Sequence, residues 1–138
     1  MALNLVATSP SLPPTKPRPA RETYTVVLAS GSDDGGKRAT FALAAACTAQ
    51  VMDFDTIVFL LGEGAHWAYE GNADRVHAPG FPALADLMDS FTEAGGHVML
   101  CSACDAVCAH AGARRADVRV RGLATLLAHT VGGSAVTF

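Results

Sequence analysis

Residues 95–105 read Gly95-Gly96-His97-Val98-Met99-Leu100-Cys101-Ser102-Ala103-Cys104-Asp105. The two glycines end the preceding segment, and the apolar run after them has the length of one buried strand. Ser102 can N-cap a helix, and Asp105 lies three residues later, as in a variant of the capping box. This stretch therefore predicts a strand that ends at Cys101 and a helix that begins just beyond it.

The same alternation of apolar runs with longer amphipathic or Ala-rich segments extends outward from this junction. The expected strands are 24–29, 56–61, 97–101, 118–120 and 135–138, and the expected helices are 39–52, 81–94, a short one carrying Cys104 and Cys108, and 123–129. Repeated strand–helix units are typical of a parallel sheet covered by helices. We expect an α/β fold, namely a three-layer α/β/α sandwich of the flavodoxin-like type with a mainly parallel sheet of about five strands. In such folds, ligands bind at the carboxyl ends of the strands, where Cys101 lies.

The length of 138 residues, half of them apolar, fits one folded domain, which we place at 23–138. Residues 1–22 contain most of the prolines and little that can form a core. This composition predicts an extended arm, which is either a flexible tail or a strap that wraps a partner subunit.

Charge and hydropathy exclude several classes of partner. The net charge of −3 gives no basic surface of the kind that binds nucleic acid or anionic membranes. No apolar stretch is long enough for a spanning helix, and the N-terminus lacks the order of a secretory signal. We therefore expect a soluble, cytoplasmic protein whose partners are proteins or small molecules.

Three of the four cysteines, Cys101, Cys104 and Cys108, have C-x2-C-x3-C spacing. A thiol at the start of a helix is biased toward the thiolate, which is the form that attacks, binds metals and accepts sulfur. Four interpretations remain open: a redox pair in which Cys101 attacks and Cys104 resolves, a metal site completed by His97 or His110, a persulfide carrier, and inert packing. Cys47, in the middle of an Ala-rich helix, is expected to pack in the core.

The first loop, Gly31 to Arg38, has the G-x4-G-K frame of a phosphate-binding loop between a strand and a helix. However, Arg38 replaces the Ser or Thr that would hold Mg²⁺, and Asp33 and Asp34 would repel phosphate. We therefore expect a Gly-rich turn with an Asp-capped helix.

Other polar and aromatic side chains are weaker candidates. His66, Trp67 and Tyr69 follow a strand end and can line the same mouth as Cys101, while His77 and His97 flank the next helix. A basic run after the cysteine helix is expected to be a solvated face, or a surface for an acidic partner. Its members are Arg114, Arg115, Arg119 and Arg121.

From Thr23 to Phe138 the chain resembles the DsrE/DsrF/TusD superfamily of small sulfur-trafficking proteins. The resemblance rests on the order and spacing of several segments. They are the opening strand 24–31, the segment Phe59-Leu60-Leu61-Gly62-Glu63-Gly64, the helix end Glu93-Ala94-Gly95-Gly96, the strand closing on Cys101, and the last strand Ala135-Val136-Thr137-Phe138. Cys108 and the arm depart from the pattern.

The resemblance implies that Cys101 accepts sulfane sulfur as a persulfide from a donor protein and passes it to an acceptor protein. It places Cys104 as a resolving or assisting thiol, with the first loop and His66 lining the mouth. It also implies homotrimers, homohexamers or mixed rings with sibling subunits, and it calls for no cofactor or metal. The alternative is a noncatalytic accessory subunit that uses the domain and the arm for assembly.

Overall fold

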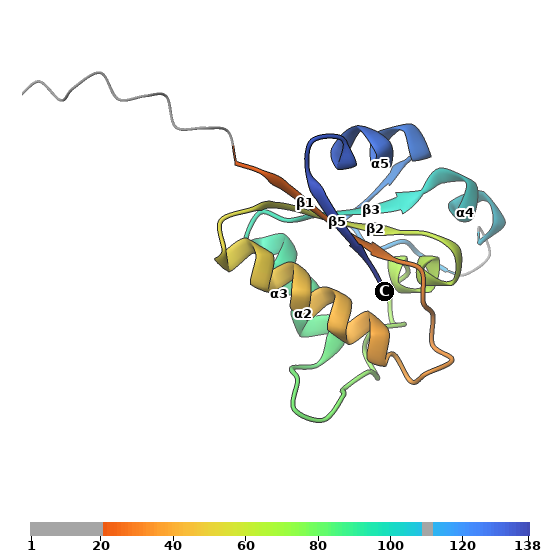
Figure 1. The fold of residues 1–138 in the computed structure, drawn as a ribbon. Coiled ribbons are helices and arrows are strands. Elements are labelled where there is room, and N and C mark those ends of the chain that lie inside the picture. Colours follow the sequence, from red (N-terminus) through yellow and green to blue (C-terminus); the bar gives the residue numbers. More distant parts are fainter. Residues whose placement is uncertain (1–20, 109–111) are drawn as a thin grey trace, which may run out of the picture.

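The computed structural model describes residues 21–108 and 112–138 (Figure 1). The elements follow one another as β1 (Thr23–Leu28), α2 (Lys37–Val51), β2 (Asp55–Leu60), η1 (Gly62–Ala68), α3 (Leu84–Glu93), β3 (His97–Cys101), α4 (Ser102–Val107), β4 (Val118–Arg121), α5 (Leu123–Thr130) and β5 (Ser134–Thr137). The five strands form one sheet in the order β4-β3-β2-β1-β5, and all neighbouring strands are parallel. The predicted α/β sandwich is confirmed.

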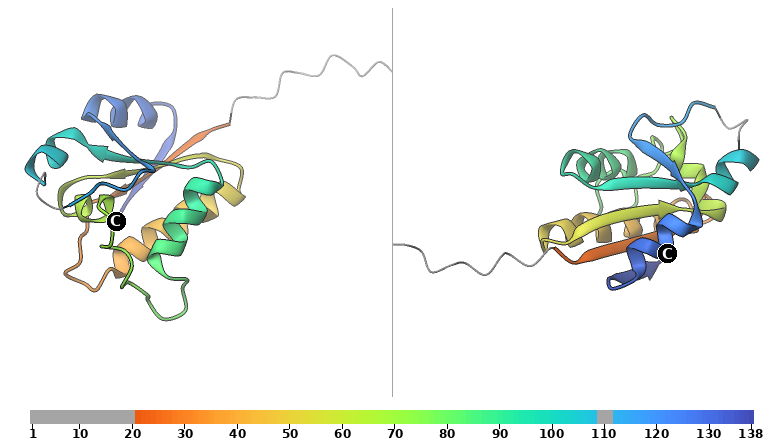
Figure 2. Two further views of the ribbon diagram at one scale, coloured as in Figure 1. Left: turned by 180° about the vertical axis from the view of Figure 1, so that it is seen from behind. Right: turned by 90° about the horizontal axis from the view of Figure 1, so that it is seen from above.

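Helices lie on both faces of the sheet, with α2 and α3 on one face and α5 on the other (Figures 1 and 2). The main core lies under α2 and α3 and includes Val26, Val58 and Leu100. Side chains alternate along a strand, so the neighbours of these residues in each strand point to the α5 face of the sheet. There a smaller cluster forms from Ile57, Phe59, Met99 and Cys101.

The first loop is held by its own carboxylate. Asp34 accepts backbone N–H bonds from Gly36, Lys37 and Arg38 at 2.9, 3.1 and 3.0 Å. Burial raises the pKa of Asp34, but these three N–H donors and the Arg38 guanidinium outweigh it and hold that pKa below its usual value. The amides that a phosphate would need are therefore already bonded. The predicted Gly-rich turn is present and Asp34 binds the first N–H groups of α2, although the N-cap residue of this helix is Gly36.

Two local predictions are wrong. Cys101 itself, and not Ser102, is the N-cap of α4, and no side chain caps that helix end. Asp105 does not complete a capping box, because its carboxylate accepts bonds from Tyr69 and Arg114 instead. In addition, α3 begins at Leu84, since Phe81 lies outside the helix and packs edge-on against Phe41.

Residues 1–20, most of the predicted arm, lie outside the described residues, as does His110. Arg21, at the start of the described chain, pairs with Asp53 and Asp55. None of the helices in the described part of the chain has the length and apolar character needed to span a membrane.

Candidate functional site

Cys101 is the last residue of β3 and faces the α5 side of the sheet. Only 5 % of it is exposed, and it packs with Ile57, Phe59 and Met99. Leu126 of α5 covers the same cluster from above. The thiol singled out by the sequence therefore lies at the expected end of the sheet, but it is sheltered from solvent.

Cys104, on the first turn of α4, contacts both the Cys101 cluster and the main core. The Gly62 N–H donates a hydrogen bond to the Cys104 Sγ at 3.2 Å. Burial raises the pKa of the Cys104 thiol, and the neighbouring Cys101 and Cys108 add to this, whereas the Gly62 N–H acts in the opposite direction. At neutral pH Cys104 is therefore mainly a thiol.

A pocket of about 530 Å³ lies between η1 and α4. Its walls are mostly apolar and include three polar side chains and two thiols. The pocket is lined by Gly62, Glu63, His66, Tyr69, Ala103, Cys104, Val107 and Cys108. Among the described residues, neither Cys101 nor the first loop contributes to this lining. The predicted shared mouth is therefore wrong in part, because Cys104 and His66 open into the pocket while Cys101 lies behind it.

Backbone packing fixes η1 beside the thiols. The Leu61 N–H donates to the Leu28 carbonyl at 3.1 Å, and the buried Trp67 donates its Nε1–H to the Ser30 carbonyl at 2.9 Å. A Cβ on Gly64 would lie 1.9 Å from the Leu28 oxygen, so a glycine is needed there. These contacts hold Gly62 within reach of Cys104.

Tyr69 links η1 to α4. Its hydroxyl donates to the Asp105 carboxylate at 3.0 Å, and Arg114 approaches the same oxygen at 3.5 Å. Burial and the bond to Asp105 raise the pKa of Tyr69 to about 12, so it stays protonated at the pocket wall. Sequence spacing gave no signal of this link, because the two residues are far apart in the chain.

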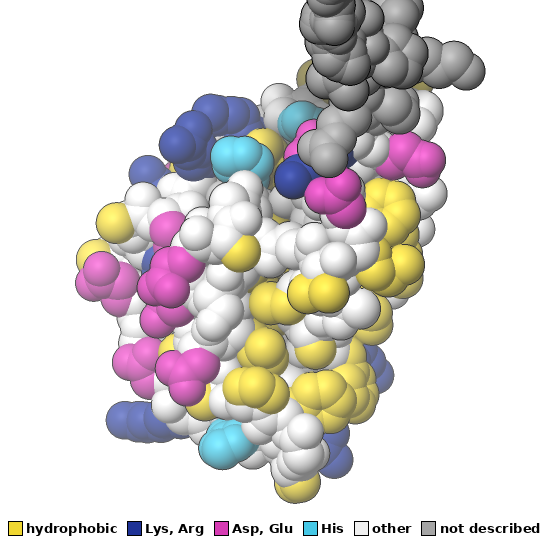
Figure 3. Space-filling view, turned by 90° about the vertical axis from the view of Figure 1, so that its left-hand side faces the viewer, with side chains coloured by type: hydrophobic (Ala, Val, Ile, Leu, Met, Phe, Trp, Pro, Cys, Tyr) yellow, Lys and Arg dark blue, Asp and Glu magenta, His cyan; other side chains and the backbone are white. Residues whose placement is uncertain are grey.

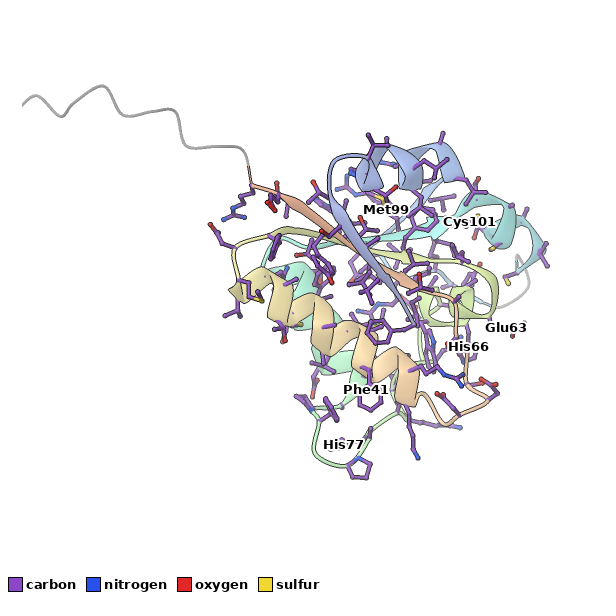
Figure 4. The ribbon with its side chains drawn as sticks, in the orientation of Figure 1. Phe41, Glu63, His66, His77, Met99 and Cys101 are labelled. Carbon is purple, nitrogen blue, oxygen red and sulfur yellow. The ribbon has the colours of Figure 1, made fainter. Side chains whose placement is uncertain are left out.

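The remaining candidate histidines do not gather around Cys101. His77 and His97 are exposed, and His97 is at the opposite end of β3 from Cys101. Figure 4 shows Glu63 and His66 at the same end of the molecule as Cys101, and His77 on a loop well away from them. The cysteine–His97 metal interpretation is therefore wrong, and within the described residues no group of three His, Cys, Asp or Glu side chains is arranged to hold a metal ion.

The basic run is only partly a solvated face. Arg115 is largely buried and pairs with Asp89 at 2.7 Å and Asp117 at 3.1 Å. Arg119 is exposed on the strand beside Met99, and Arg121 is exposed beside Cys101. Cys47 is half-buried under α3 and donates to the Leu87 carbonyl at 3.7 Å, which agrees with its predicted packing role.

Comparison with known proteins gives a family match and a structural match. The model of the DsrE/DsrF-like family matches residues 23–134. Among solved structures, the crystal structure of the ychN protein from E. coli superimposes with a TM-score of 0.67, covering 86 % of this chain and 99 % of that one. The two sequences are 17 % identical, so this likeness shows the fold. The search of curated proteins returned no match.

Proposed function

The chain belongs to the DsrE/DsrF-like family, which is associated in general with sulfur relay, and we propose that it is a sulfur carrier. In this proposal Cys101 accepts sulfane sulfur as a persulfide and passes it on, and Cys104 is the assisting thiol. Its partners are a donor and an acceptor of sulfane sulfur, each carrying a cysteine persulfide or thiol.

The transfer needs no cofactor and no net redox change. The Cys101 thiolate attacks the outer sulfur of a donor persulfide, R–S–SH, forming Cys101–Sγ–SH and releasing R–S⁻. Delivery repeats the step, with an acceptor thiolate attacking the outer sulfur and Cys101 leaving as a thiolate. Each transfer breaks one S–S bond and forms one.

The observation that carries the proposal is the contact between Cys101 and Cys104 beside a pocket of about 530 Å³. A small donor fits this pocket, and turning the short Cys104 side chain to another rotamer gives its sulfur a path to Cys101. The buried position then shields the persulfide from water and from stray thiols. Cys104 is itself partly exposed, so its side chain has room to turn toward the pocket.

The experiment loads the reduced protein with glutathione persulfide, removes the excess by desalting, and follows intact mass. A persulfide adds about 32 Da. We expect this mass on the chain directly after loading, and we expect an acceptor thiol added at that point to gain the sulfur that the chain loses. A chain that gains no mass on any cysteine would refute the proposal.

A second candidate function is that of a noncatalytic accessory subunit, and exposed apolar surface favours it. Leu123 and Leu127, one turn apart on α5, are 55 % and 62 % exposed. Phe41, Val51 and Met52 are exposed along α2, and hydrophobic side chains gather over one half of the face in Figure 3. Exposed apolar side chains that gather together on a surface are typical of association sites.

Assembly is tested by replacing both α5 leucines with glutamate. We expect the parent chain to run as a trimer or hexamer in light scattering, and the double variant Leu123→Glu, Leu127→Glu to run as smaller species. Lys37→Glu, which changes the net charge by the same amount at another exposed position, is the control. If the double variant has the same mass in solution as the parent chain, the exposed face of α5 is not part of the subunit interface.

A further inference from the structure

Cys101 and Cys104 occupy the N-cap and the third residue of α4. Side chains at these two positions of a helix lie close together, which is the geometry that allows an N-cap side chain to reach N3. Both thiols are free, and Cys104 packs against the cluster that contains Cys101. The pair is therefore placed to form a disulfide.

We infer that Cys104 attacks the persulfide formed on Cys101, so that the chain releases its sulfur as hydrosulfide and is left with a Cys101–Cys104 disulfide. This inference rests on the proposed sulfur-carrier function and adds a reductive activity to it. In the absence of an acceptor, the carrier becomes a source of hydrosulfide.

The step balances in atoms and electrons. The Cys104 thiolate attacks Sγ of Cys101–Sγ–SH, the bond from Sγ to the outer sulfur breaks, and HS⁻ leaves. The two cysteine sulfurs end in the disulfide, and the outer sulfur leaves with its proton as hydrosulfide. The sulfane sulfur gains two electrons, and the two cysteine thiols lose them. A dithiol reductant then restores the thiols and becomes a disulfide itself, at one dithiol per turnover.

Packing assigns this role to Cys104 and not to Cys108. Both line the pocket, because they are four residues apart on one face of α4. Only Cys104 packs against the cluster of Cys101, whereas Cys108 packs against the main core on the other face of the sheet. Cys108 therefore offers a comparison within the pocket, because it is a second pocket thiol that is placed away from Cys101.

The test treats the reduced full-length protein with glutathione persulfide and measures trapped hydrosulfide together with the non-reduced intact mass. We expect the parent chain to gain about 32 Da and then to become about 2 Da lighter than the reduced chain as hydrosulfide appears. Cys104→Ala is expected to keep the added sulfur and to release at least about tenfold less hydrosulfide. Cys108→Ala is expected to become a disulfide and release hydrosulfide once it is loaded, and Cys47→Ala, at a free thiol outside the pocket, is expected to behave like the parent chain.

The results that would contradict the inference distinguish the reductive step from the carrier function. A parent chain that holds the added sulfur, with no hydrosulfide and no disulfide, would overturn the reductive step and leave the carrier function standing. A chain that shows neither added sulfur nor hydrosulfide would overturn both. Loss of release in Cys108→Ala but not in Cys104→Ala would overturn the assignment of the resolving thiol.

Discussion

Replacing Cys101 with serine is expected to lower stable sulfur loading at least about tenfold, because a serine hydroxyl neither attacks a persulfide at neutral pH nor holds sulfane sulfur. The measurement is the fraction of chains carrying one added sulfur after desalting, compared in a Cys104→Ala background, which is expected to keep the added sulfur. Serine is nearly the same size as cysteine, so the buried cluster with Phe59 and Met99 should remain packed. A thermal unfolding curve checks that the fold is retained.

Cys47→Ser is the matched control for this experiment. Cys47 is also a partly buried thiol, but it lies under α3, where it donates to the Leu87 carbonyl. We expect it to load like the parent chain. Full loading of Cys101→Ser, combined with loss of loading when another cysteine is replaced, would show that the sulfur is held elsewhere.

Gly64→Ala is expected to destabilise the fold by about 3 kcal/mol or more, the range for severe overpacking. The new Cβ would lie 1.9 Å from the Leu28 carbonyl oxygen and 2.7 Å from its carbon. Both sides of this clash are backbone, so no rotamer change relieves it. The Leu28 oxygen is also fixed by the Leu61 N–H, which leaves β1 and η1 to move apart.

Thermal unfolding should show a fall in Tm of about 10 °C or more for Gly64→Ala. The control is Gly122→Ala, whose Cβ would have Ser102 Oγ as its nearest atom at 3.8 Å, an ordinary contact. Gly122 is the N-cap of α5, so this change should cost about 1 kcal/mol or less. Equal stability of the two variants would contradict the close packing of η1 on β1.

Movement of η1 away from β1 in Gly64→Ala should also change the surroundings of Cys104. Gly62 lies two residues before Gly64, and its N–H is the donor to Cys104. If Gly64→Ala is folded at low temperature, η1 should no longer hold this donor in place. Alkylation of Cys104 by a small maleimide, mapped by mass, would then be expected to change in rate relative to Gly122→Ala.

Much of the fold was predictable because hydrophobic periodicity is a local property of the chain. The run from His97 to Cys101 is a strand, as predicted, and the predicted strand 56–61 is the central strand β2, which runs from Asp55 to Leu60. Helix ends were less predictable, as the start of α3 shows, because Phe81 fits the helical spacing but packs on Phe41 from outside the helix.

The candidate site was predicted in its residues more than in its arrangement. Cys101 and His66 lie at the carboxyl end of the sheet (Figure 4), and Cys104 lines the pocket there together with His66. The cap assignment failed because Asp105 is drawn to Tyr69 and Arg114. Hydrogen bonds between residues far apart in the chain cannot be predicted from the spacing of neighbouring residues.

The sequence by itself determined the parallel α/β sandwich, the Asp34 turn and the placing of three thiols after one strand, because each depends on neighbours along the chain. Only the tertiary structure decided that Cys101 is buried on the α5 face while Cys104 opens into the pocket. The physical reason is that a strand sends alternate side chains to opposite faces, and the helices that cover each face come from distant segments. Which thiol meets solvent therefore depends on packing between α4, α5 and η1.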